Sequence, residues 1–306
     1  MDVNLLITDG KGKFTEVGWS KPEIADDEIE VKAIMTGVCR SDIDMMTGKF
    51  GPLPIHMSGH EGLGLVTKIG DNINNVNPGD FVATRGEPAY ADYYNVKYNE
   101  YVVVPEAHPR YILEPVACGI NVIEQNMQQI LQRTTTEFSR ILIRGTGFLA
   151  YCAYRTLKQR CVQGMIDIVG KSNRDLWYSC LDERNDELLD QSPRGSYDVV
   201  IDLKGCPDTF TSHFRDNALL IVGSNMQVNM NLQKLLWGAV TINFPSPRNP
   251  NFIECMRLAE AWITNGVLNV DSFWTRSYNR TTEWQKAFAD GLNRPNGYSR
   301  GYIKWD

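Results

Sequence analysis

Three short stretches concentrate the side chains that could bind a metal or move a proton. GVCRSD, residues 37–42, sets a thiol, a guanidinium, a hydroxyl and a carboxylate side by side. SGHEGLG then supplies His60 and Glu61, and ILEPVACG supplies Glu114. A thiolate, an imidazole and a carboxylate are all good zinc ligands. Three protein ligands with one open position are typical of a catalytic zinc.

Each of these residues also has a simpler interpretation when it is taken alone. A single cysteine is most often packed in a core, and a single histidine is most often a satisfied polar group. The stretch around Cys39 can equally be a polar turn that happens to hold a thiol. No one spacing proves a metal site, so the interpretation depends on what the rest of the chain supplies.

A glycine-rich turn in the middle of the chain indicates a dinucleotide site. RILIRGTGFLAY places Gly145 and Gly147 directly after an expected strand and at the start of an expected helix. Gly145 permits the tight turn, and Gly147 lets the backbone approach a pyrophosphate at the helix N-terminus. Ala150 replaces the third glycine, where a small residue suffices for packing. The alternative is an ordinary glycine turn, but the flanking strands and helix favour the nucleotide.

The end of the next expected strand bears on which dinucleotide binds. NAD sites usually carry a carboxylate there, whereas NADP sites use cations and small polar groups. In MIDIVGKSNRDLW, Asp167 comes a few residues too early for that carboxylate. The strand tip instead holds Gly170, Lys171, Ser172 and Arg174. We therefore expect NADP rather than NAD; the alternative is that the two cations are solvated surface charges.

Two kinds of element must position these residues. The first third of the chain alternates apolar and polar residues in short β-branched runs with glycine- and asparagine-rich loops, as in a compact, partly open barrel. The expected strands include residues 28–39, 62–70, 79–86 and 100–107. From Ser139 onward, continuous apolar runs alternate with helical segments, which is typical of a doubly wound α/β domain with a parallel sheet.

Composition excludes several classes of protein. The 306 residues carry a net charge of -6, and the pI is about 5.4, which argues against nucleic-acid or membrane partners. The N-terminus lacks the pattern of a signal peptide, and no apolar run is long enough to span a membrane. The seven scattered cysteines do not suggest a disulfide framework, so we expect reduced thiols and a cytoplasmic protein.

Together these motifs resemble the zinc-dependent medium-chain dehydrogenase/reductase family, the alcohol and polyol dehydrogenases. The resemblance runs from about residue 29 to the C-terminus, and the motifs occur in the family's order: GVCRSD, GHEGLGLVTKIG, NPGDFV, EYVVVP, EPVACG, GTGFLA and YDVVIDLKG. It implies a GroES-like β-barrel catalytic domain of residues 1–116 and 267–306. It also implies a doubly wound Rossmann cofactor domain of residues 117–266.

The resemblance assigns roles around one catalytic zinc. Cys39 and His60 would be ligands, and Glu114 stands where polyol dehydrogenases place a glutamate ligand. Cys118, four residues further on, is the alternative third ligand. Glu61 would approach the metal from behind the ligands or replace a water. Zinc would polarise the oxygen of an alcohol, polyol, aldehyde or ketone while hydride passes to or from the nicotinamide.

The remaining site residues follow from the same resemblance. Asp42 would hold the second nitrogen of the histidine ligand, and Ser41 would start the proton relay. Asp44 stands where some alcohol dehydrogenases carry a relay histidine. Arg40 and Arg300 would reach the cofactor pyrophosphate.

The sequence also departs from the family. The four clustered cysteines of a structural zinc are missing from residues 83–101, so we expect no second zinc. The loops are short, which keeps two other functions open: a zinc-free quinone or enone reductase of the same superfamily, and a non-catalytic nucleotide-binding protein. Family habit predicts a homodimer or homotetramer.

Overall fold

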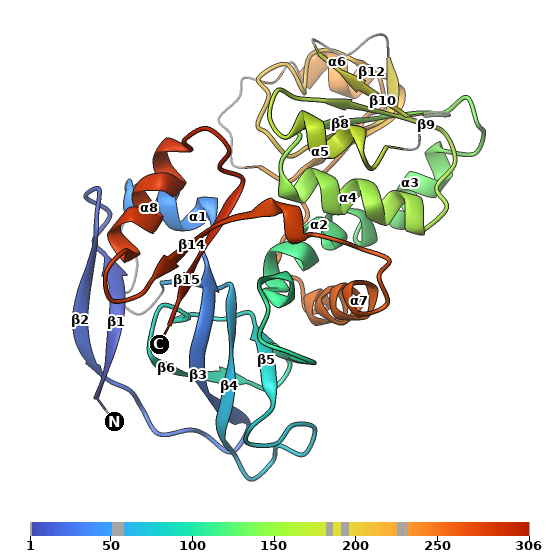
Figure 1. The fold of residues 1–306 in the computed structure, drawn as a ribbon. Helices are drawn as coiled ribbons and strands as arrows, with labels where there is room; N and C mark the ends of the chain where they lie inside the picture. The colour runs from blue at the N-terminus through green and yellow to red at the C-terminus, as the bar shows by residue number, and fades with distance from the viewer. Residues whose placement is uncertain are drawn as a thin grey trace. The chain divides into compact units, whose positions relative to one another are not determined.

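The computed structural model describes residues 2–50, 58–181, 186–190, 196–224, 230 and 232–305. The chain forms two compact units (Figure 1). The first contains Met1–Ala117 and Met256–Asp306, and the second contains Cys118–Cys255. Two helices, α2 (Glu114–Glu124) and α7 (Phe252–Thr264), run across the divisions between the units.

The first unit is built on a seven-stranded sheet. Its strand order is β14-β15-β3-β4-β5-β7, and β6 pairs with β3 outside this path. All pairs are antiparallel except β14 with β15. The strands are β3 (Glu28–Gly37), β4 (Gly62–Ile69), β5 (Phe81–Thr84), β6 (Tyr93–Lys97), β7 (Tyr101–Val104), β14 (Trp274–Asn279) and β15 (Arg300–Lys304).

Smaller elements complete this unit. A hairpin of β1 (Asp2–Thr8) and β2 (Phe14–Ser20) is bridged to the rest through Leu5 and Ala91. One core joins apolar side chains of the hairpin, the sheet and α8, because alternate strand residues point to the same face. The helical elements are α1 (Arg40–Met46), η1 (Pro109–Tyr111), η2 (Asp271–Phe273) and α8 (Trp284–Asn293).

The second unit is a six-stranded parallel sheet. The order β10-β9-β8-β11-β12-β13 winds outward in both directions from β8, as the doubly wound α/β expectation requires. Its central strands are buried, which explains their continuous apolar runs. The strands are β8 (Arg140–Arg144), β9 (Met165–Val169), β10 (Glu187–Leu189), β11 (Tyr197–Asp202), β12 (Phe214–Val222) and β13 (Thr241–Asn243).

In the second unit, α3 (Met127–Arg133) precedes the first strand. Three further described helices come after β8, β9 and β12, and these are α4 (Phe148–Gln159), α5 (Arg174–Tyr178) and α6 (Leu232–Trp237). Across the described part of the chain, no helix combines the length and the apolar character needed to cross a membrane.

Candidate metal centre and cofactor loops

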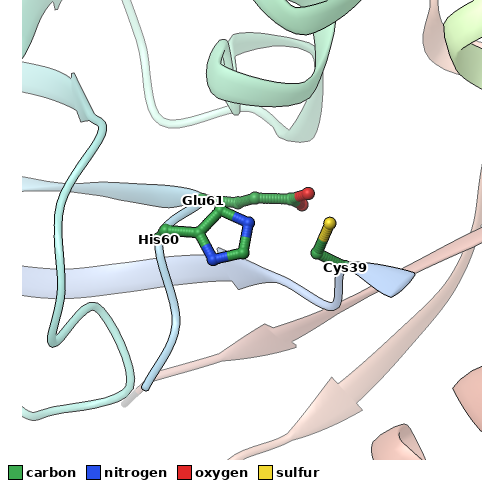
Figure 2. Close-up of side chains that lie close together, drawn as sticks. All are labelled: Cys39, His60 and Glu61. Carbon is green, nitrogen blue, oxygen red and sulfur yellow. The ribbon is translucent and has the colours of Figure 1, made fainter. Parts of the chain in front are cut away.

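The ends of two neighbouring strands bring together three metal-binding side chains. β3 pairs antiparallel with β4, and Thr36 lies opposite Gly62. Cys39 follows the end of β3, while His60 and Glu61 directly precede β4, so the register alone places them side by side. One ligand atom from each lies within 4.8 Å of the other two. Figure 2 shows a ring nitrogen of His60 and the Glu61 carboxylate directed toward the Cys39 side chain.

A buried carboxylate lies behind His60. Asp42 is in the first turn of α1, and its Oδ2 accepts hydrogen bonds from the Cys39 amide and the Tyr90 hydroxyl, both at 2.8 Å. Its Oδ1 lies 3.6 Å from His60 Nδ1 and makes no hydrogen bond with any described residue. A histidine that binds metal through Nε2 carries its proton on Nδ1, and such a proton needs an acceptor. The Oδ1 of Asp42, unpartnered among the described residues and 3.6 Å from Nδ1, is placed to accept that proton, so these residues fit a metal.

The electrostatics of this cluster also favour a cation. Burial raises the pKa of the Cys39 thiol, and the Glu61 charge raises it further. Burial likewise raises the pKa of Asp42. Burial alone would lower the pKa of His60, but the neighbouring Asp42 charge and the hydrogen bond with Cys39 raise it well above 6.5. A cation among these buried acids would offset the cost of ionising them.

Glu61 and Arg300 form a buried ion pair at the back of the cluster. The Arg300 guanidinium donates to both carboxylate oxygens of Glu61, which is completely buried. Burial lowers the pKa of Arg300, but the charge of Glu61 outweighs this effect and raises it. The guanidinium also lies 5.0 Å from the ring centroid of Trp274. The structure thus places Arg300, expected at the cofactor pyrophosphate, against Glu61.

The structure places the other predicted catalytic residues around α1. Ser41 Oγ lies 3.4 Å from His60 Nε2. Asp44 accepts from Lys49 Nζ at 2.8 Å and pairs with Arg40 Nε at 3.3 Å. Lys49 and Arg40 therefore both pair with Asp44, the residue expected where some alcohol dehydrogenases carry a relay histidine.

The predicted third ligand lies outside the compact cluster. Glu114 is buried at the first residue of α2, and its charge contributes to the raised pKa of His60. It is not among the described residues whose ligand atoms lie within 4.8 Å of one another, whereas Glu61 is. Cys118, the alternative ligand, belongs to the second unit.

The glycine-rich turn of the second unit has the geometry expected of a dinucleotide loop. Gly145 has a φ of +128°, a conformation that favours glycine, and its amide donates to Val169 O at the end of β9. Gly147 is the N-cap of α4, and a Cβ there would meet no described atom within 4 Å. Packing therefore does not explain this glycine, whose bare backbone leaves room for a ligand. Ala150 is buried against the sheet.

The loop after β9 is fastened to this turn. Thr146 Oγ1 lies 3.1 Å from Ser172 Oγ, and its carbonyl accepts from Asn173 and from the Trp177 indole. A Cβ on Gly170 would overlap the Thr146 hydroxyl, so glycine is required there for contact. Sequence reasoning missed Thr146, because only the fold shows that the two loops touch.

The two cations after β9 differ in their surroundings. Arg174 donates to the Gly170 and Leu189 carbonyls and pairs with Asp190 at 2.6 Å, which joins the ends of β9 and β10. Lys171 is exposed to solvent.

Comparisons with known proteins agree with this architecture. Residues 25–115 match the family model of the alcohol dehydrogenase GroES-like domain. The chain is 26% identical to D-arabinitol dehydrogenase 1 of Uromyces fabae, over 90% of this chain and 89% of that protein. It is 22% identical to D-arabitol-phosphate dehydrogenase of Enterococcus avium, over 91% of each chain. The NADH complex of an alcohol dehydrogenase, rspB of E. coli CFT073, has a TM-score of 0.80 at 15% identity, over 99% of both chains.

The first unit is therefore a GroES-like domain and the second a Rossmann-type domain. Residues 25–115 match the GroES-like domain of alcohol dehydrogenases, and over about nine tenths of its length the chain is similar to dehydrogenases of polyols. It is an oxidoreductase of the alcohol dehydrogenase type.

Proposed function

We propose that this protein is a zinc- and NADP-dependent dehydrogenase that interconverts a polyol or secondary alcohol with its carbonyl compound. The observation that carries the proposal is the cluster of Cys39, His60 and Glu61, whose ligand atoms lie within 4.8 Å of one another. A zinc-free quinone or enone reductase would have no use for a thiol, an imidazole and a carboxylate whose ligand atoms meet in one cluster. The relatives that act on arabinitol and arabitol phosphate support a polyol substrate.

The residues divide the work as follows. Cys39 and His60 hold zinc, and Glu61 or Glu114 completes the protein ligands. When bound, zinc supplies Lewis-acid polarisation of the substrate oxygen, and the nicotinamide supplies the hydride chemistry. Asp42 keeps the His60 proton on Nδ1, which leaves Nε2 as the ligand atom.

Proton movement falls to a hydroxyl at the edge of the cluster. Ser41 Oγ, 3.4 Å from His60 Nε2, would accept the proton of the alcohol while it passes its own hydroxyl proton to solvent water, and the reductive direction reverses both transfers. Asp44 pairs with Arg40 on the same helix. The expectation that Arg40 and Arg300 bind the cofactor pyrophosphate stays a prediction, because Arg40 pairs here with Asp44 and Arg300 with Glu61.

The cofactor assignment depends on the second unit. Gly145, Gly147 and Ala150 accept the pyrophosphate at the start of α4. Lys171 and Ser172 supply the charge and the hydroxyl for a 2'-phosphate, on a loop that Gly170 and Arg174 hold in place. A substrate panel run with both cofactors and followed by nicotinamide absorbance tests this assignment, and a clear preference for NAD would overturn it.

Metal analysis tests the zinc proposal directly. We expect about one zinc per purified chain, consistent with the single catalytic site, and loss of that zinc in Cys39→Ser. Cys161→Ser is the matched control, because Cys161 is a free, exposed thiol of the second unit. Wild-type protein without zinc, or Cys39→Ser protein that retains it, would refute the proposal.

We also propose that two copies associate through the edge of the second unit. β13 pairs only with β12 in the described part of the chain, and such an edge is self-complementary. Four large apolar side chains in residues 232–244 are 66 to 79% exposed: Leu232, Leu236, Trp237 and Phe244. Exposed apolar groups in this number mark an interface.

A further inference from the structure

One tyrosine touches all three segments that carry the metal centre. The Tyr90 hydroxyl lies 3.0 Å from the carbonyl of Gly37, which ends β3, and 2.8 Å from Asp42 Oδ2. The backbone around Tyr90 also pairs with the approach to His60, since the Tyr90 amide donates to Ser58 O. The turn before Cys39, the first turn of α1 and the loop before His60 therefore share one neighbour.

The ring of Tyr90 is closely packed on several sides. Gly59, with a φ of +76°, packs so closely that a Cβ there would lie 2.6 Å from the ring. On its other sides the ring makes edge-to-face contacts with Phe14 and Phe288, at centroid distances of 5.8 and 5.3 Å. A buried side chain held in this way delivers its hydroxyl to one fixed point.

We propose that Tyr90 is a positioning residue of the metal centre, which acts on His60 by fixing the Asp42 carboxylate. This inference rests on the proposed zinc function. The Tyr90 hydroxyl and the Cys39 amide both donate to Asp42 Oδ2. With Oδ2 occupied, the carboxylate cannot rotate freely, and Oδ1 faces His60 Nδ1.

Burial and the Asp42 charge raise the pKa of Tyr90 well above 10, so its hydroxyl stays protonated, and able to donate, even in mildly alkaline solution. Removing an outer hydrogen-bond partner of a metal ligand typically costs ten- to a hundredfold in affinity.

The first test uses Tyr90→Phe in metal-free protein, because this variant loses one oxygen and keeps the ring. In wild type we expect a low-field, exchange-protected Nδ1–H signal from His60 in the ring NMR spectrum, where the chain has only four histidines. Tyr90→Phe should lose this signal, and Tyr94→Phe should keep it. Tyr94 is the matched control, since it is equally buried and its hydroxyl lies 2.9 Å from the Thr84 hydroxyl. A signal absent from wild type or retained in Tyr90→Phe overturns the inference.

The second test measures zinc affinity by competition with a chromophoric chelator. Tyr90→Phe should weaken zinc binding about tenfold, and Tyr94→Phe less than twofold. Adding Tyr90→Phe to Asp42→Asn should cause no further loss, because Tyr90 acts through Asp42. If the two substitutions weaken zinc binding by factors that multiply in the double variant, the inference is overturned. If wild type binds no zinc, the proposed function fails, while the NMR measurement still decides the role of Tyr90.

Discussion

A single added methyl group at the end of β3 should break the candidate site. Gly37 is the last residue of β3, and a Cβ there would overlap Glu61 Oε2 and lie 3.1 Å from Glu61 Cβ. Glu61 cannot swing away, because it is completely buried and held by Arg300. Breaking such a buried pair costs about 3–5 kcal/mol, a large part of the roughly 5–15 kcal/mol that stabilises a typical protein.

The assay is thermal unfolding of Gly37→Ala, with zinc content measured on the same sample. A loss of this size lowers Tm by roughly 6–20 °C for a unit of this length, and zinc should be lost with it. Gly18→Ala is the control, since Gly18 lies in β2 and a Cβ there would meet nothing within 4 Å. Both glycines have φ values outside the left-handed region, so backbone strain does not separate them. A Gly37→Ala protein that matches Gly18→Ala in Tm and zinc content would refute the reasoning.

Three further outcomes follow from other parts of the fold. Lys21 and Glu30 form a buried pair at 2.9 Å, so Lys21→Met should cost about 3–5 kcal/mol in urea unfolding at pH 7. Burial alone would raise the pKa of Glu30, but hydrogen bonds from Lys21 and a threonine lower it below 4.5. The ionised pair therefore contributes fully to the free energy of unfolding above pH 4.5, and this contribution is lost as the pH falls through the lowered pKa. The difference in stability between wild type and Lys21→Met should accordingly narrow in acid. An unchanged gap would contradict this. Gly170→Ala should displace Thr146 and weaken NADP binding about tenfold, or 1.4 kcal/mol, as measured by titration calorimetry. An unchanged affinity would show that the contact between Gly170 and Thr146 does not matter for cofactor binding. Trp237→Glu should shift the protein to a monomer in sedimentation, and an unshifted oligomer would exclude this edge.

The pattern of apolar and polar residues along the chain was enough to predict the strands of both sheets. The β-branched alternation of residues 28–39 became β3, and the apolar run before Gly145 became β8. These elements follow from side-chain periodicity, which the sequence displays directly. Cys39 and His60 could also be named, because their types limit the chemistry available to them.

The partners of these residues could not be read from the chain. Glu61 and Glu114 were both candidates, and only the packing shows that Glu61 shares the cluster of Cys39 and His60 while bound to Arg300. Sequence spacing carries no information on which of two buried carboxylates reaches a given point.

Sequence by itself therefore determined the elements and the kinds of side chain at their ends. The tertiary structure decided which ends meet: the register of β3 on β4 places Cys39 beside His60, and the packing of Tyr90 against Gly59 brings its hydroxyl to Asp42. The physical reason is that periodicity is a property of neighbours along the chain. A metal centre depends instead on contacts between residues far apart in sequence, which only the packed core can specify.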